Sequence, residues 1–324
     1  MSMRLKGLII ALSLLLSPVA ANAESDWPKR PVTSIGPFSA GGGVDIALRA
    51  IATFVKDHLG EPMLATNKPG GGTTAAAIEM LSKPADGYTV VSLMSSGYVP
   101  EVYKFFYDVP YTSQDLIPVI RFCAFPFAAY VNSASPWKTL DDFTNAAKAR
   151  PGKLAYGHTG RGLQLHLAPA AWMDAAGIKL REVPTKGAAE VLQLVLGKHI
   201  DVGTSSITAG KKYVDAGELR MLAIQSEKRD PSVPDIPTFK ELGYDFGFPP
   251  NAVSMFVKKG TPPAVVAKLH DAIKKTLEDP RFLEVAKKSQ LTLLYGDAAA
   301  IAKDMEAERT AVAGALKKIG MWKE

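Results

Sequence analysis

The chain has 324 residues, of which 38 are basic and 32 acidic, so that its formal net charge is +6. It has five histidines and a single cysteine, Cys123, which excludes an internal disulfide; no Cys/His cluster has metal-ligand spacing, so neither a metal nor another cofactor is expected. The basic residues are scattered rather than clustered, which argues against nucleic acid as a partner. Cys123 lies in VIRFCAFPFAAYV, where we expect a small buried side chain in a strand.

Residues 1–23 have the pattern of a secretory signal peptide. Arg4 and Lys6 precede the apolar run LIIALSLLLSPVA, and the small residues ANA end at Ala23. A charged segment, an apolar segment and a small-residue cleavage site follow one another in this order in such peptides. The apolar run is shorter than the roughly 20 residues that span a bilayer, which disfavours a membrane anchor. We therefore expect cleavage after Ala23 and a mature protein in the periplasm.

The first structural unit is a strand, a glycine-rich loop and a helix. VTSIGPF is rich in β-forming residues, and the stretch GPFSAGGGVD follows at Gly36–Asp45. Beyond it, apolar residues recur at the spacing i, i+3, i+4, i+7 and i+8, which predicts an amphipathic helix; they are Ala47, Ala50, Ile51, Phe54 and Val55.

This unit recurs along the chain. NKPGGG leads into a helix over residues 73–82, TVVSLM is a strand that ends at SSG, KLAYG leads through HTGRG into a helix, and IDVGTSS leads into another. Alternation of strands and helices predicts an α/β fold with parallel sheets. In such folds ligands collect beyond the carboxyl ends of strands, which places the loops at 40–43, 95–97, 157–162 and 204–206 near a ligand.

Two crossings of the chain between domains are predicted around residues 120–130 and 244–250. They divide the mature chain into a discontinuous first domain, 24–124 and 246–324, and a second domain, 125–245. The C-terminal helices are expected to return to the first domain.

Motifs for catalysis are missing at the spacings that catalysis requires. The sequence has no Walker loop, no G-x-G-x-x-G, no G-x-S-x-G elbow and no H-E-x-x-H. A secreted hydrolase that uses Ser95 or Ser96 is an alternative, but no base or oxyanion arrangement accompanies either serine. We therefore expect a binding protein rather than an enzyme.

Glycines at helix starts favour the binding of an anion. They let backbone N–H groups approach a ligand closely, and the helix dipole there favours negative charge. A tight turn alone remains the alternative for Ala40–Gly43, and Asp45 can cap the helix, contact a ligand, or do both. Arg161 is either a solvated loop residue or a partner for an anionic ligand.

The sequence resembles the Bug (TctC-type) periplasmic substrate-binding receptors of tripartite tricarboxylate transporters. WPKRPVTSIGPFSAGGGVDIALR resembles the opening strand, loop and helix of that family, and NKPGGG resembles its N-R-P-G-A-G segment. KPADGYTV, PGKLAYGHTGRG, VPTKGAAE, AGELRMLAIQSEKR, PDIPTFKELGYD and KKGTPPAVVAKL follow in the order of the family.

The resemblance implies a type II-like periplasmic binding protein, a Venus flytrap of two α/β domains with a ligand cleft between them. It implies that loop groups hold the ligand: Phe38, Ala40, Gly41, Gly42, Asp45, Ser95, Ser96, His158, Thr159, Gly160 and Gly162. Gly43 belongs to the same first loop. We expect selectivity to come from His158, Arg161, Gln164, Thr204 and Ser205.

The sequence departs from the family pattern in the expected distal pocket. His158 stands where a serine is usual, Leu163 where a serine is common, and Thr185 where a tyrosine is frequent. Gly203 and Thr204 replace an aromatic residue and an aspartate that many members have. An ammonium group would require a carboxylate, so the absence of an acid at Thr204 argues against an amino-acid ligand.

These observations predict a monomeric receptor that binds a small di-, tri- or aromatic carboxylate. It would deliver this ligand to the integral-membrane permease subunits of a tripartite tricarboxylate transporter. A periplasmic sensor that presents its ligand-bound form to a signalling partner is the alternative, and it would have the same fold.

Overall fold

The computed structural model describes residues 26–104, 106, 109–158, 162–185, 187–245 and 247–318. The predicted signal peptide, 1–23, lies outside these residues. Within them, no helix is both long enough and apolar enough to cross a membrane.

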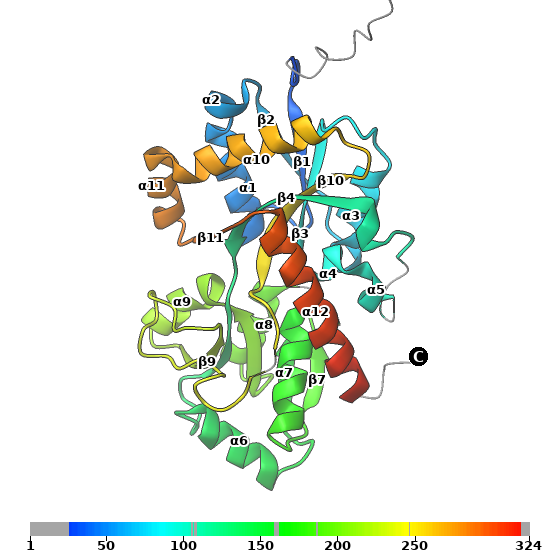
Figure 1. Ribbon diagram of the computed structural model, residues 1–324. Helices are drawn as coiled ribbons and strands as arrows, with labels where there is room; N and C mark the ends of the chain where they lie inside the picture. The colour runs from blue at the N-terminus through cyan, green and yellow to red at the C-terminus, as the bar shows by residue number, and fades with distance from the viewer. Residues whose placement is uncertain are drawn as a thin grey trace, which may run out of the picture.

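The first of two β-sheets has six strands in the order β11-β4-β10-β3-β1-β2 (Figure 1). These strands are β1 (Val32–Gly36), β2 (Met63–Asn67), β3 (Thr89–Met94), β4 (Leu116–Ala124), β10 (Ala252–Lys258) and β11 (Thr292–Gly296). β1 is parallel to β2 and β3, whereas β10 is antiparallel to β3 and β4, and β11 is antiparallel to β4.

The second sheet has five strands in the order β7-β6-β8-β5-β9. These strands are β5 (Phe127–Asn132), β6 (Ala155–His158), β7 (Arg181–Pro184), β8 (Val202–Ser206) and β9 (Leu219–Gln225). β6 is parallel to β7 and β8, and β5 is antiparallel to β8 and β9.

The prediction of parallel sheets is therefore wrong for part of each sheet, and both are mixed. Helical crossovers return the chain in the same direction, which keeps β1–β3 and β6–β8 parallel. The antiparallel strands lie next to the passages between the sheets. β4 ends at Ala124 and β5 begins at Phe127, while β9 ends at Gln225 and β10 begins at Ala252.

Helices cover both faces of the first sheet, so that there is one hydrophobic core on each face. Residues of a strand alternate between these two cores. Val32 of β1 is buried with α1, α10 and α11, whereas Ile35 is buried with α3, α4 and α12. The helices of this domain are α1 (Gly43–Phe54), α2 (Lys56–Leu59), α3 (Thr74–Leu81), α4 (Ser95–Tyr98), α5 (Pro100–Tyr103), α10 (Pro263–Glu278), α11 (Pro280–Lys288) and α12 (Ala298–Lys318).

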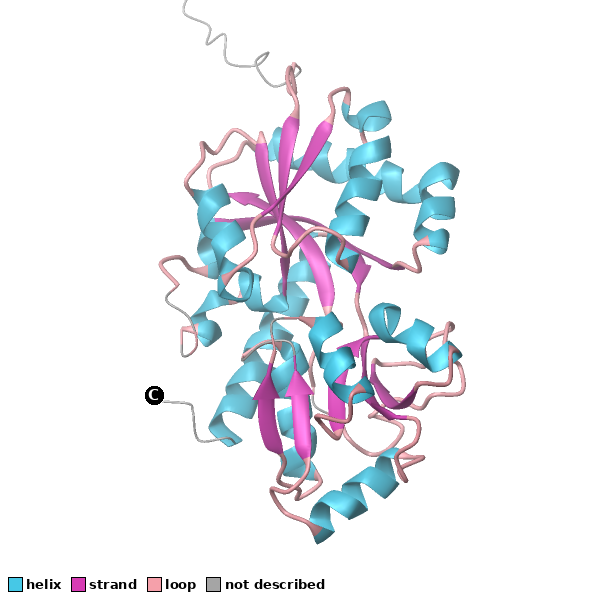
Figure 2. Cartoon of the chain, turned by 180° about the vertical axis from the view of Figure 1, so that it is seen from behind, coloured by secondary structure: helices cyan, strands magenta, loops and turns pink. Residues whose placement is uncertain are grey.

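The second sheet is also covered on both faces (Figure 2). One core contains Phe143 of α6 (Leu140–Ala149) and Trp172 of α7 (Gln164–Ala175). The other contains Val191 of α8 (Ala188–Leu196) and Ile207 of α9 (Ile207–Asp215).

The C-terminal helix α12 joins the two domains instead of returning to the first alone. It packs on β4 and also runs beside α7 of the second domain (Figure 1). Val312 and Leu316 share a core with Leu167 of α7, and Arg121 of β4 pairs with Asp304. The C-terminal helices were expected to return to the first domain; α12 does pack on that domain, but it also contacts the second.

Cys123 is buried in β4, as predicted. Burial raises the pKa of its thiol to about 12, so the side chain stays a neutral apolar group.

Candidate functional site

The first glycine loop connects the carboxyl end of β1 to the first turn of α1. Gly41 has a φ of +83°, in the left-handed region that favours glycine, and Gly42 is the extended residue that precedes the helix. Ala40 is exposed, while Phe38 packs partly against the first core. The first four amides of a helix have no carbonyl acceptor within it, so this loop presents backbone donors to an anion.

Asp45 holds this loop in shape. Its side chain is 4% exposed, and Oδ2 accepts hydrogen bonds from the Gly41 N–H at 2.9 Å and from Arg49 Nε at 3.0 Å. Oδ1 accepts one from Asn67 Nδ2 at 2.9 Å, and the same amide nitrogen donates to the Phe38 carbonyl at 2.9 Å. Both carboxylate oxygens are thus engaged by the protein, and Asp45 fixes the two ends of the loop.

Burial opposes ionisation of Asp45, but the hydrogen bonds from Arg49, Gly41 and Asn67 outweigh it and hold the pKa of this carboxyl below its usual value. Asp45 is therefore charged at neutral pH.

Gly43 allows the start of α1 to lie against the first crossing between the domains. A Cβ at this position would lie 2.6 Å from the Phe125 ring, too close for any larger residue without movement of the ring. Phe125 lies between β4 and β5, so the glycine loop is adjacent to the segment at which the domains join.

Ser95 and Ser96 begin the short helix α4, immediately after the carboxyl end of β3. Because β3 is parallel to β1, the carboxyl ends of the two strands lie on the same side of the sheet, and the two serines are therefore on the same side as the glycine loop.

Thr73 lies beside α4 and is a candidate site residue that the sequence did not predict. It has a φ of +88°, is 1% exposed, and its hydroxyl has no hydrogen-bond partner in the described part of the chain. A Cβ on Gly97 would lie 2.2 Å from this hydroxyl oxygen. Non-glycine residues with left-handed backbone are strained, and such residues are concentrated at functional sites. No local sequence pattern predicts the left-handed conformation of Thr73.

The second glycine loop follows β6 in the second domain. Thr159, Gly160 and Arg161, which were predicted to bind the ligand, lie outside the described residues. Gly162 closes this loop with a φ of +79°, and a Cβ there would lie 2.5 Å from the Phe106 ring of the first domain. Phe106 therefore brings the first domain into contact with this loop.

His158 is fully buried at the end of β6. Its Nε2 lies 2.8 Å from Oε1 of Glu182 on β7, and its ring stacks on Tyr156 with centroids 5.4 Å apart. The role of His158 in selectivity stays a prediction.

Three further candidates for selectivity are also buried, with exposed fractions of 3% for Gln164, 2% for Thr204 and 0% for Ser205. Gln164 Nε2 donates to the Pro249 carbonyl at 2.9 Å and lies 3.3 Å from Glu308 Oε2 of α12. The Thr204 hydroxyl donates to the Leu165 carbonyl at 2.8 Å. These contacts stabilise the second domain and its junction with α12, and a direct ligand contact by these residues stays a prediction.

The predicted ligand-binding residues of the first domain and those of the second lie at the carboxyl ends of parallel strands, and these ends point toward each other. In Figure 1, β1 enters from the outer end of the first domain and runs toward the second. In Figure 2, strands of the second domain have their arrowheads toward the first. His158 and Thr204 lie at the carboxyl ends of the parallel strands β6 and β8, as the glycine loop and Ser95 do for β1 and β3.

One group of side chains has the composition of a metal site. His158, His166 and Glu182 each offer a ligand atom, and these atoms lie within 4.8 Å of one another. However, Nδ1 of His166 accepts the Gly162 N–H at 3.0 Å, so the proton of the neutral ring is on Nε2. A protonated nitrogen has no lone pair for a metal, and this geometry favours a hydrogen-bonded cluster instead.

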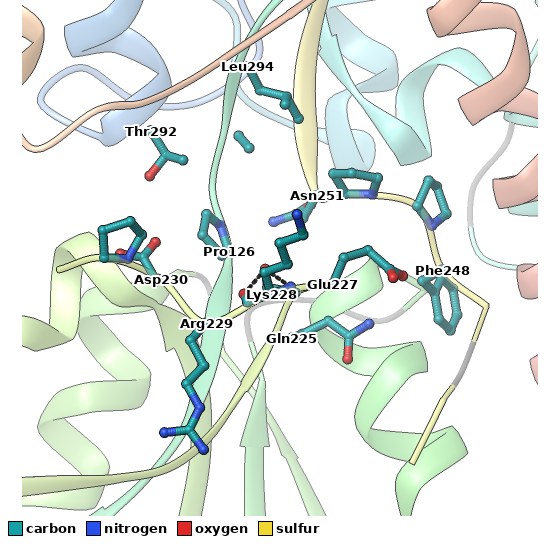
Figure 3. Close-up of a pocket in the computed structure, with 15 residues that line it drawn as sticks. Pro126, Gln225, Glu227, Lys228, Arg229, Asp230, Phe248, Asn251, Thr292 and Leu294 are labelled. Carbon is teal, nitrogen blue, oxygen red and sulfur yellow. Dashed lines mark hydrogen bonds between the residues drawn. The ribbon is translucent and has the colours of Figure 1, made fainter. Parts of the chain in front are cut away.

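A cavity of about 300 Å³ lies where the two passages between the sheets meet β11 (Figure 3). Pro126, Phe248 and Leu294 contribute apolar walls; Lys228 points toward Asn251, whereas Arg229 points away from the cavity. None of the predicted site residues that the structure describes lines it, so the cavity is separate from the first glycine loop.

Comparison with known proteins gives a match to the model of the tripartite tricarboxylate transporter family receptor (TctC) over residues 47–321. A UPF0065 protein from the gbd 5′ region of Cupriavidus necator is 35% identical over 286 residues, which are 88% of this chain and 86% of that protein. Protein BugT of Bordetella pertussis is 29% identical over 279 residues, covering 86% of this chain and 85% of that protein.

Solved structures show the same fold. The periplasmic binding protein BugD matches with a TM-score of 0.78 and 29% identity, over 92% of this chain and 100% of that one. Rpa4515 of R. palustris, solved with adipate, matches with a TM-score of 0.81 and 26% identity, over 91% of this chain and 99% of that one. The fold predicted from the family resemblance, a periplasmic binding protein with two α/β domains, is confirmed.

Proposed function

Since the chain belongs to the tripartite tricarboxylate transporter receptor family, whose members are solute-binding receptors and not enzymes, we propose that it captures a small organic carboxylate in the periplasm and delivers it to the permease of such a transporter. The protein acts as a monomer, and its ligand is held between the two domains. The solved relative that contains adipate supports a carboxylate as the ligand class.

The observation that carries this proposal is the first turn of α1 with the loop that Asp45 braces. Amides of Gly42, Gly43 and Asp45 point out of the helix start without intrahelical acceptors, and the helix dipole adds a favourable term of about 0.3–1 kcal/mol for an anion. The N–H of Gly41 is already bonded to Asp45, so Gly41 contributes its conformation rather than its donor. Ser95 and Ser96 extend this wall.

The second wall is the loop at 158–162. Its glycines allow backbone groups to approach the ligand, and Arg161 binds a second carboxylate on the same molecule. His158, Gln164, Thr204 and Ser205 act on selectivity by positioning this loop.

Closure is a hinge motion at two segments, residues 125–126 and residues 247–251. This assigns 24–124 and 246–324 to the first domain and 125–245 to the second. The close packing of Phe125 against Gly43 couples the first hinge to the glycine loop.

Thermal-shift titration of the mature protein tests the ligand class. The compounds compared are adipate, citrate, benzoate, acetate and aspartate. A ligand at a hundredfold excess over its Kd stabilises the folded state by about 2.7 kcal/mol, so its binding raises the Tm measurably. A shift with at least one of adipate, citrate and benzoate, and none with the amino acid aspartate, is expected. If no carboxylate shifts the transition, the proposal is wrong.

Gly42→Val tests the location of the site. The backbone of Gly42 suits any residue, and an added Cβ meets only the Ser39 carbonyl at 3.6 Å, so the variant should fold. It should lose carboxylate binding because its side chain occupies the ligand side of the loop. Gly314→Val on α12 is the matched control, since nothing lies within 4 Å of a Cβ there. Unchanged binding by Gly42→Val would exclude this loop.

A further inference from the structure

The two crossings between the domains are joined at Phe125 of the first and Asn251 of the second. The N–H of Phe125 donates to the Asn251 carbonyl at 2.7 Å, and Nδ2 of Asn251 donates to the Phe125 carbonyl at 2.8 Å. This pair lies one step beyond Ala124 and Ala252, which are partners in the antiparallel ladder of β4 and β10. Both residues of the pair are buried. A side-chain amide thus supplies one of the hydrogen bonds that hold the crossings together.

The backbone ladder cannot continue past this pair. Pro126 follows Phe125 on one crossing, Pro250 precedes Asn251 on the other, and a proline has no backbone N–H to donate. The Asn251 amide therefore links the crossings at the position where the ladder ends.

Just beyond the pair, the second domain holds both crossings. The Pro126 carbonyl accepts a hydrogen bond from the Ile207 N–H at the start of α9, at 3.0 Å. The Pro249 carbonyl accepts one from Nε2 of Gln164 in α7, at 2.9 Å. A hinge at these crossings therefore bends between the prolines, which are bonded to the second domain, and the pair of Phe125 and Asn251, which extends the first sheet.

The Phe125 ring connects this pair to the first glycine loop. A Cβ at Gly43 would lie 2.6 Å from Cε1 and 3.1 Å from Cδ1 of the ring, so the ring fills the space beside the first residue of α1. Val44 and Leu48 of α1 are buried in the same core as the ring. Because close-packed groups move together, a displacement of Phe125 displaces the start of α1.

We propose that Asn251 is a positioning residue of the first ligand-binding wall: its side chain fixes Phe125 at the hinge, and the Phe125 ring fixes the start of α1. This inference rests on the proposed function, in which the first turn of α1 binds a carboxylate. Since Asn251 acts through Phe125, its replacement changes the geometry of the wall and leaves the backbone donors of the wall in place.

Proton NMR of the mature protein measures the contact between the ring and Gly43 directly. In the wild type, the Gly43 Hα protons should show nuclear Overhauser effects to the Phe125 ring and shifts displaced by its ring current. Asn251→Leu removes the donor and keeps a side chain of similar size, and it should move these shifts toward ordinary glycine values. Asn132→Leu is the matched control, because Nδ2 of Asn132 also donates to a backbone carbonyl, that of Leu196 at 3.0 Å in the second domain. It should leave the Gly43 signals unchanged.

Calorimetric titration of the same proteins with adipate, citrate and benzoate measures the effect on binding. Affinity for the acids that the wild type binds should fall about tenfold in Asn251→Leu, since a displaced supporting residue misplaces the groups that it holds. Asn132→Leu should bind as the wild type does, even if it is less stable. Phe125→Leu should also weaken binding, and the double variant Asn251→Leu with Phe125→Leu should bind no more weakly than Phe125→Leu alone.

Three results would overturn the inference. The first is wild-type affinity in Asn251→Leu, and the second is a double variant in which the two losses multiply, because Asn251 would then act independently of the ring. The third is a wild type without contacts between Gly43 and Phe125, a measurement that requires no variant to fold.

Failure of the proposed function has a different result. In that case the wild type itself binds none of the three acids, and both proposals are wrong. Failure of the inference alone leaves wild-type binding intact, with Asn251→Leu equal to the wild type or independent of Phe125.

Discussion

Asp45 and Gly41 are joined by a hydrogen bond of 2.9 Å from the backbone N–H of the glycine to the carboxylate of the aspartate. The first turn of α1 is thereby tied back to the loop that precedes it. The same carboxylate reaches Phe38 through Asn67, so one buried acid organises the whole loop. This arrangement turns a flexible triplet of glycines into a defined surface.

Asp45→Asn should destabilise the protein by about 2 kcal/mol, because hydrogen bonds to a buried charged group contribute about 1.5–3 kcal/mol. The variant keeps one acceptor oxygen but loses the ion pair with Arg49. Urea unfolding at pH 7 measures the change, with Asp141→Asn at the exposed start of α6 as the control. A change of less than 0.5 kcal/mol, roughly that of a surface substitution, would contradict the assigned role.

The stability that Asp45 adds should depend on pH. Its pKa is lowered in the folded protein, so its contribution is complete above the value of about 3.9 for an unfolded aspartate and is lost as the pH falls through the folded-state pKa. The difference in urea midpoint between wild type and Asp45→Asn should thus be larger at pH 7 than at pH 3. An equal difference at both pH values would show that the charge of Asp45 is unimportant.

Gly162→Ala should be more costly than Gly152→Ala. Both glycines have left-handed backbone, with φ values of +79° and +71°, for which an alanine costs roughly 1 kcal/mol. Only Gly162 also meets a neighbour, the Phe106 ring at 2.5 Å, whereas nothing lies within 4 Å of a Cβ at Gly152. The free energy of unfolding, measured in urea, should therefore fall further for Gly162→Ala.

A double-mutant cycle separates the two causes. In a Phe106→Ala background the excess cost of Gly162→Ala over Gly152→Ala should disappear, while the cost common to both remains. An excess that persists without the Phe106 ring would mean that the contact between the domains is not its source.

Gln164→Leu should destabilise the protein by about 1–3 kcal/mol and change the ratio of adipate to citrate affinity. The substitution removes the donor to Pro249 and Glu308 at the junction of α7, the second crossing and α12. Gln193→Leu is the control, because the side-chain amide of Gln193 donates to the Tyr213 hydroxyl at an exposed position. An unchanged ratio of adipate to citrate affinity would remove Gln164 from the residues that act on selectivity.

Arg161→Ala should weaken adipate binding by about tenfold or more and leave a monocarboxylate unaffected, since a charge-assisted pair contributes about 1.5–3 kcal/mol. Titration with adipate and acetate measures this. Equal affinities of variant and wild type for adipate would remove Arg161 from the site.

The local units and the family can be read from the sequence alone. Glycines after an apolar strand and before an amphipathic stripe specify a loop and a helix start, because backbone conformation and helical periodicity are local properties. The order of the motifs along the chain predicted the fold, and the comparisons confirm it.

Which side chains come into contact depends on the tertiary structure. Glu182 and His158 are 24 residues apart and become neighbours because β6 and β7 pair in parallel, with His158 opposite Pro184. The antiparallel insertion of β10 between β3 and β4 and the reach of α12 to α7 arise in the same way, from packing between distant segments. Such contacts depend on register and burial over the whole chain, and no local spacing records them.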